Sequence, residues 1–268
     1  MRNGKYKIKR YKTHHSKWVI FLLLAAFLGV LLYFYTRHAP DLPSAAQPVT
    51  DPADTRHETR VITLPAGQWF ALQLGAFEEE KSAQALATNY RSRGAAGYIH
   101  RQDTCRVLAA AYEDRESARA VQAQLAQKHG VDAYLYPMAR SEVTLRLSGQ
   151  KAQLDALEDA FSLCDQLTYS FASLSQALDK GEISAREAQE ALRSQQDTIR
   201  AVNSRMLTLF ANSEHPAVQR LSRLLQGTQD QVALAIQSPD TARLGSSIKY
   251  CHLYLLCGLE SYVQSLSP

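Results

Sequence analysis

The sequence lacks the short patterns that mark many enzyme active sites. It contains no G-x-S-x-G, no H-E-x-x-H and no phosphate-binding loop, and its eight histidines are dispersed along the chain. Acidic pairs such as Glu158 and Asp159 lie in polar surroundings that are typical of solvated helix faces. We therefore expect a non-enzymatic protein without a metal site or a cofactor.

Cysteine is also scarce. The four cysteines are Cys105, Cys164, Cys251 and Cys257, and none belongs to a C-x-x-C pair that would indicate zinc. Six helical residues rise about 9 Å, so Cys251 and Cys257 are too far apart to bridge. We expect buried thiols, and a disulfide from Cys164 to one of the other two is the alternative.

The positive charge of the chain is confined to one end. The net charge is +4, but seven Lys or Arg lie in residues 1–17, and the remainder has 23 Lys and Arg against 26 Asp and Glu. A nucleic-acid partner normally requires a concentrated basic surface. The sequence therefore argues against nucleic acid, whereas the basic tail suits anionic lipid.

A long uncharged segment follows this basic tail, at residues 18–35. Eighteen helical residues span about 27 Å, close to the hydrocarbon thickness of a bilayer, whereas the core of a signal peptide has about 7 to 15 residues. The positive-inside rule keeps residues 1–17 in the cytoplasm, so we expect a single-pass signal-anchor with the bulk of the chain extracytoplasmic. Small residues at 44–46 leave a cleaved signal peptide as the alternative.

Residues 36–61 contain four prolines and no apolar periodicity. Proline-rich chain extends about 3 Å per residue. This segment is predicted to be a linker that holds a domain away from the membrane.

Alternating strand and helix patterns follow in residues 62–140. Period-two alternation predicts strands, and apolar residues spaced three and four apart predict helices. The expected elements are strands at 69–77, 96–100, 105–112 and 131–137, and helices at 82–92 and 116–128. This βαββαβ order predicts a ferredoxin-like four-stranded antiparallel sheet with both helices on one face and the other face bare.

The residues of this unit resemble the SPOR (sporulation-related) domain of bacterial envelope proteins. The resemblance rests on WFALQLGAF at 69–77, CRVLAAAY at 105–112 and ARAVQAQL at 118–125. The chain departs from the family pattern at Cys105, which replaces an aromatic residue, and at 110–112, where Ala-Ala-Tyr replaces Gly-Pro-Phe. The resemblance implies binding to peptidoglycan, and in particular to glycan strands stripped of their stem peptides.

Four residues are candidates for glycan contacts on the bare face. A bare glycan offers hydroxyls and acetamides over apolar ring faces, so its binder needs hydrogen-bonding amides or guanidinium groups beside aromatic rings. Gln73 and Arg106 supply the first, Trp69 and Tyr112 supply the second, and simple alternation places all four on one face. The alternative is that they are ordinary solvated or edge-packing residues.

Residues 148–268 carry four apolar stripes at helical spacing, separated by turn signals. They predict an all-α antiparallel bundle. Ser184 and Glu187 form a capping box at the start of the second helix. The fourth helix is apolar almost all round, which favours either a buried central helix or a partner-binding surface.

These observations predict an α+β protein with four parts after its basic tail: a transmembrane helix, a linker, the βαββαβ domain and the helical bundle. It would be a cell-membrane-anchored peptidoglycan-binding protein that acts at the septum in cell division, or in sporulation-related remodelling of the cell wall. The competing interpretation is an interaction scaffold that recruits envelope proteins through the helical half. An RNA-recognition-like sheet shares the strand order but lacks the basic and aromatic signature.

Overall fold

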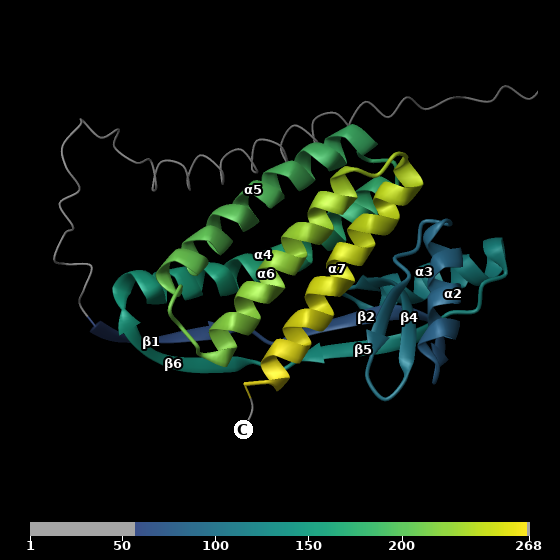
Figure 1. Ribbon diagram of the computed structural model, residues 1–268. Helices are drawn as coiled ribbons and strands as arrows, with labels where there is room; N and C mark the ends of the chain where they lie inside the picture. Colours follow the sequence, from purple (N-terminus) through teal and green to yellow (C-terminus); the bar gives the residue numbers. More distant parts are fainter. Residues whose placement is uncertain (1–56, 267–268) are drawn as a thin grey trace, which may run out of the picture. The chain divides into compact units, whose positions relative to one another are not determined.

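The computed structural model describes residues 57–266. The expected basic tail, the signal-anchor at 18–35 and the linker up to residue 56 lie outside the described residues. None of the helices between 57 and 266 is both long enough and apolar enough to cross a membrane. The described part of the chain combines antiparallel sheets with a C-terminal helical region (Figure 1).

The predicted βαββαβ unit is present. Its sheet has the order β3-β4-β2-β5 and is antiparallel throughout. Helices α2 and α3 contact the sheet from one face, as predicted. The elements are β2 (Gly67–Phe77), α2 (Glu80–Arg91), β3 (Tyr98–Arg101), β4 (Cys105–Tyr112), α3 (Arg115–His129) and β5 (Tyr134–Arg140).

Local sequence signals explain the ends of α3. The Asp114 carboxylate accepts a hydrogen bond of 2.6 Å from the Ser117 amide, which satisfies one free donor of the first turn. Gly130 ends the helix with a φ of 60°, a left-handed conformation that glycine adopts without a steric penalty.

A second, two-stranded sheet was not predicted. Strand β1 (His57–Leu64) pairs antiparallel with β6 (Val143–Gln150), and the ribbon continues the pairing of β2 with β5. Ile62 and Leu64 are buried against the helical region. The linker expected over 36–61 is therefore corrected at its end, because residues 57–61 belong to β1.

The helical region consists of α4 (Lys151–Asp179), α5 (Ala185–Leu209), α6 (Pro216–Ile236) and α7 (Thr241–Gln264). Consecutive helices pack together, and α7 also packs against α4 (Figure 1). The capping box is confirmed, because the Ser184 side chain accepts from the Glu187 amide and the Glu187 carboxylate accepts from the Ser184 amide.

Helix α7 is buried on two sides. Leu244, Ile248 and Leu255 face the bundle core, whereas Leu253 and Leu256 pack against the sheet. The prediction of a central buried helix is confirmed. The prediction of a bare sheet face is wrong, because the apolar residues on the second side of α7 need cover and the sheet supplies it.

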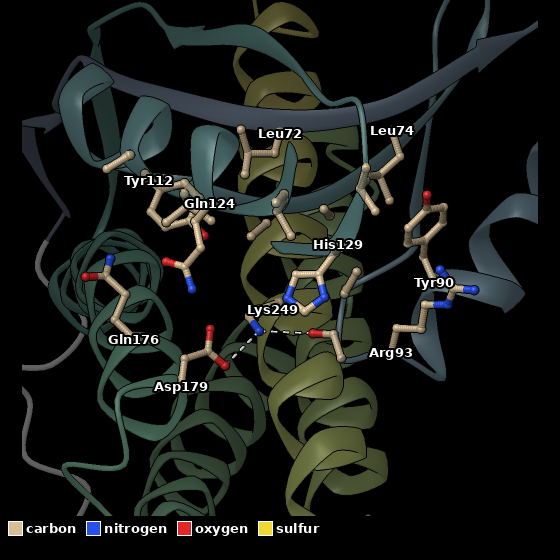
Figure 2. A pocket seen from close by; sticks show the side chains of 18 of the residues that line it. Leu72, Leu74, Tyr90, Arg93, Tyr112, Gln124, His129, Gln176, Asp179 and Lys249 are labelled. Carbon is tan, nitrogen blue, oxygen red and sulfur yellow. Dashed lines mark hydrogen bonds and ion pairs between the residues drawn. The ribbon is translucent and has the colours of Figure 1, made fainter. Parts of the chain in front are cut away.

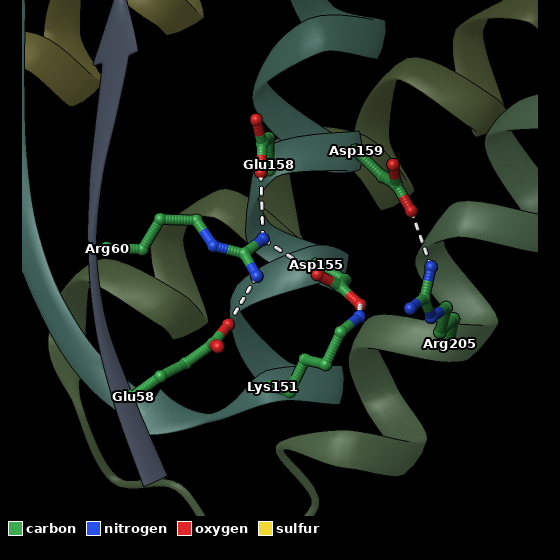
Figure 3. Close-up of polar contacts among 7 residues, drawn as sticks. All are labelled: Glu58, Arg60, Lys151, Asp155, Glu158, Asp159 and Arg205. Carbon is green, nitrogen blue, oxygen red and sulfur yellow. Dashed lines mark hydrogen bonds and ion pairs between the residues drawn. The ribbon is translucent and has the colours of Figure 1, made fainter. Parts of the chain in front are cut away.

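A polar cluster joins β1 to α4 (Figure 3). The Arg60 guanidinium donates to Asp155 at 2.7 Å, to Glu158 at 3.0 Å and to Glu58. Lys151 contacts the same Asp155 at 2.6 Å. This network fixes the two-stranded ribbon against the first helix of the bundle.

All four cysteines are free thiols. The disulfide considered for Cys164 is therefore absent, and Cys164 and Cys251 are buried apolar residues as expected. Burial raises the pKa of both thiols to about 12, so they stay protonated and unreactive at neutral pH.

Candidate functional site

Trp69 is buried in the contact between the sheet and the helical region. Its side chain is only 3% exposed. Its ring centroid lies 4.8 Å from that of His252 on α7 and 5.2 Å from that of Tyr169 on α4. Trp69 lies on the predicted face, but no sugar can stack on it in this arrangement because α7 and α4 already cover the ring.

Tyr112 lies on the other face of the sheet. Ala71 pairs with Ala111 and Gln73 pairs with Leu108, so two steps along β2 correspond to three along β4. The extra residue is a β-bulge, which reverses the alternation of side chains beyond it. Tyr112 therefore packs with the α3 side of the sheet, and the prediction that it shares a face with Arg106 is wrong.

Gln73 and Arg106 remain on the α7 side, where the sheet is partly accessible. Gln73 is paired with Tyr134, whose side chain is 64% exposed. The Arg106 guanidinium lies 5.3 Å from the centre of the Tyr136 ring and donates to the Thr104 hydroxyl at 2.7 Å. These residues form the uncovered end of the sheet face.

The contact between the sheet and α7 contains several polar atoms without partners. Within residues 57–266, His100 Nε2, Arg106 Nε, His252 Nε2 and Glu260 Oε2 are buried and form no hydrogen bond. His100 Nε2 lies 4.0 Å from Glu260 Oε2, beyond hydrogen-bond distance. These four atoms therefore have no hydrogen-bond partner among the described protein atoms.

Burial sets the charge of these groups. It lowers the pKa of His252 to about 3 and raises the pKa of Glu260. It also lowers the pKa of His100, to which the nearby Arg106 charge contributes. Both histidines are therefore neutral at pH 7, and they stabilise the contact as ring surfaces and not as cations.

A cavity of about 930 Å³ lies on the opposite side of the sheet, between α2, α3 and the ends of the bundle helices (Figure 2). Leu74 of β2 lines it as a half-buried apolar residue, above the buried Leu72 of β2 and Ala109 and Ala110 of β4. One face of α3 lines it at helical spacing, through Ser117, Ala120, Val121, Gln124 and Leu125.

Polar groups from both parts of the chain converge on this cavity. Figure 2 shows Tyr112 beside Gln124, with Gln176 and Asp179 of α4 on the same side and with Tyr90 and Arg93 across from them. Lys249 of α7 bridges the parts, since its Nζ donates to Asp179 at 2.8 Å and to the Gly94 carbonyl at 3.0 Å. Burial, followed by the charge of Asp179, raises the pKa of Tyr112, so its phenol stays a hydrogen-bond donor.

This cavity was not predicted from the sequence, although one signal for it is present in β4. Two consecutive alanines that line the cavity, Ala109 and Ala110, occupy the middle of a central strand. Small side chains there leave space above the sheet, provided that no helix residue fills it. The sequence gives no indication of how far α2 and α3 stand apart.

No metal centre is indicated among residues 57–266, where no group of three or more His, Cys, Asp or Glu side chains could hold an ion. The groups that line the cavity and carry amide, hydroxyl or basic functions suited to a polar organic ligand include Tyr112, Ser117, Gln124, Gln176, Arg93 and Lys180.

Comparison with known proteins supports the resemblance seen in the sequence. The model of the SPOR domain family matches residues 66–137, which begin just before β2 and end within β5. No curated protein and no solved structure shows a significant match to this chain. The expected resemblance is thus confirmed as a family match over about a quarter of the chain, in which residues 66–137 match the SPOR domain.

Proposed function

We propose that this chain binds peptidoglycan glycan strands from an extracytoplasmic position, anchored to the membrane by residues 18–35. SPOR domains are peptidoglycan-binding domains, generally of proteins involved in cell division, and the match over residues 66–137 is the observation that carries the proposal. The net charge of about −3 beyond the basic tail is consistent with a ligand other than nucleic acid.

In this proposal the protein is a binding protein and not an enzyme, and it acts in wall remodelling at a septum or during sporulation. The polar cavity groups suit hydrogen bonding to sugars, and the sequence carries none of the hydrolase patterns considered above. The anchor and the linker would place the SPOR domain within reach of the wall.

The test is co-sedimentation of the detergent-solubilised full chain with purified cell-wall sacculi. The full chain is required because α7 and α4 bury part of the SPOR sheet, as Trp69 shows. We expect the chain to pellet with sacculi, and to pellet more strongly after an amidase has removed the stem peptides. Failure to pellet with either preparation would reject the function.

The covered sheet face favours a second candidate, a scaffold that recruits envelope proteins through its helices. Leu207 of α5 and Leu234 of α6 are 54% and 60% exposed and offer apolar surface for such contacts. Two results together would support the scaffold over the wall-binding protein. A fluorescent fusion would localise to septa, and the purified chain would not pellet with sacculi.

A further inference from the structure

We propose that the glycan-binding site of this chain is the cavity between α2, α3 and the bundle, and that its ligand is an anionic glycan with free muramic-acid carboxylates. This inference rests on the proposed function and names the site and the ligand chemistry for it. It moves the site from the sheet face that α7 covers to the face that carries the SPOR helices.

The cavity has the size of a ligand pocket. Ligand pockets in proteins are about 300–1,000 Å³, and the cavity of about 930 Å³ lies within that range. On the α7 side, by contrast, the space beside Trp69 and Glu260 amounts to only about 10 Å³. Of these two spaces, only the cavity has room for a sugar residue without movement of a helix.

The cavity is lined by both apolar and polar side chains. Leu74, Val121 and Leu125 are half-buried and give an apolar surface for the faces of pyranose rings, while Gln124 and Gln176 offer amides to hydroxyl and acetamide groups. A purely apolar ligand such as an acyl chain would bury these amides without partners, which is unfavourable. The mixture of surfaces therefore favours a sugar over a lipid.

Cationic side chains lie at the rim of the cavity. Asp179 is already paired with Lys249 at 2.8 Å, whereas Arg93 and Lys180 are exposed at the cavity. The Arg93 guanidinium lies 5.5 Å from the centre of the Tyr90 ring. A cation–π interaction with this ring stabilises the position of the guanidinium. Removal of a stem peptide leaves a lactyl carboxylate on each muramic acid, and a guanidinium pairs well with a carboxylate.

Tyr112 contributes both a ring and a hydroxyl to the lining of the cavity. Its side chain is 8% exposed and lines the cavity, and the β-bulge at Ala109 and Ala110 turns it to this side. Its phenol is protonated and therefore able to donate to a sugar oxygen. The one candidate residue that alternation placed on the wrong face is thus the one found in the cavity.

The experiment titrates the full chain with two soluble oligosaccharides by calorimetry. The first is amidase-released glycan, which carries lactyl carboxylates, and the second is a chitin oligosaccharide of equal length, which lacks them. We expect the first to bind more tightly. Arg93→Gln and Tyr112→Phe should each raise its Kd about 3- to 10-fold, the effect of one lost polar contact.

A pair of alanines on α3 provides a matched steric control. Ala120 lines the cavity and is exposed, so Ala120→Trp should obstruct the cavity and raise the Kd more than tenfold without disturbing the core. Ala123 is exposed on the same helix and does not line the cavity, so Ala123→Trp should change the Kd less than twofold. Melting temperatures of both variants would verify that they fold.

The outcomes separate this inference from the function it rests on. If Arg106→Gln and Gln73→Ala weaken binding while Ala120→Trp does not, the sheet face is the site and the inference is overturned, although wall binding stands. If Arg93→Gln weakens both oligosaccharides equally, the assigned carboxylate recognition is rejected. If wild type binds neither oligosaccharide nor sacculi, the proposed function fails together with the inference.

Discussion

Trp69 of β2 and His252 of α7 pack edge to face, with their ring centroids 4.8 Å apart and their planes at 76°. The pair joins the SPOR sheet to the bundle, and both side chains are almost completely buried. Aromatic pairs in this geometry contribute about 0.5–1.5 kcal/mol beyond the area that they bury. The two parts of the chain are therefore expected to unfold as one cooperative unit.

Replacing Trp69 tests this coupling. Trp69→Ala should lower the free energy of unfolding by about 3–5 kcal/mol, because it opens a cavity between the sheet, Tyr169 and His252. Urea unfolding followed by circular dichroism measures the change. Tyr134→Ala is the control, since that side chain is 64% exposed and its loss should cost less than about 0.5 kcal/mol. Equal effects of the two substitutions would contradict the buried position of Trp69.

The strand and helix order of the SPOR domain was predictable because its patterns are local. Alternation in β2 and helical spacing in α3 are visible in short windows, and Asp114 and Gly130 mark the ends of α3. The family match over residues 66–137 agrees with the same segments. Pairing of β1 with β6 escaped detection because its register depends on two strands about 80 residues apart.

The cover over the sheet was not predictable from local patterns. A helix that is apolar all round needs two partners, and the sequence of α7 does not say whether the second is this chain or another protein. The structure shows Leu253 and Leu256 against the sheet, so the partner is internal. The same limit applied to Tyr112, since an alternation pattern does not reveal the bulge at Ala109 and Ala110.

The buried His252 predicts a pH dependence of stability. Its pKa is lowered to about 3 by burial, whereas an unfolded histidine titrates near 6.5. Between these values the unfolded state binds the additional proton, so His252 favours unfolding increasingly as the pH falls below about 6.5. The upper limit of this contribution is about 1.4 kcal/mol per pH unit.

His252→Phe isolates that contribution. The substitution keeps a ring against Trp69 and removes the buried Nε2, so at pH 7 stability should change by less than about 1.5 kcal/mol. Wild type should lose stability relative to the variant as the pH falls from 6.5 to 4, measured by urea unfolding at each pH. A constant difference over that range would show that His252 is not buried as a neutral ring.

Two glycines at the contact between α6 and α7 should respond differently to alanine. A Cβ at Gly258 would lie 2.3 Å from Cδ1 of Leu224, whose side chain is buried in the core. A Cβ at Gly227 would lie 1.9 Å from the hydroxyl of Tyr254, whose side chain is half-exposed. Alanine gains about 1 kcal/mol of helix propensity at either position. Overpacking costs about 1–3 kcal/mol where the neighbour cannot move.

Gly258→Ala should therefore destabilise the protein, while Gly227→Ala should be close to neutral because Tyr254 is able to turn away. Thermal unfolding of the two variants provides the comparison. A larger loss for Gly227→Ala would mean that Tyr254, and not Leu224, is the rigid neighbour.

The Arg60 cluster should contribute measurably to the docking of the β1–β6 ribbon. Arg60 contacts Glu58, Asp155 and Glu158, and its side chain is 27% exposed. Among the residues that the structure describes, Arg205 forms one ion pair, with Asp159, and its side chain is 43% exposed (Figure 3). Networked and partly buried ion pairs stabilise proteins more than isolated surface pairs, which contribute about 0–1 kcal/mol. Arg60→Ala should cost about 1–2 kcal/mol, and Arg205→Ala less than about 1 kcal/mol.

Salt should distinguish these two substitutions further. Ions screen exposed charges strongly, so in 1 M salt the loss of stability caused by Arg205→Ala should almost vanish. Part of the loss caused by Arg60→Ala should persist, because Arg60 and its partner Asp155 are both only 27% exposed. Urea midpoints in low and high salt measure both changes. Equal losses of stability for the two substitutions at both salt concentrations would contradict this prediction. The contacts of Arg60 with three carboxylates would then stabilise the ribbon against α4 no more than a single surface ion pair does.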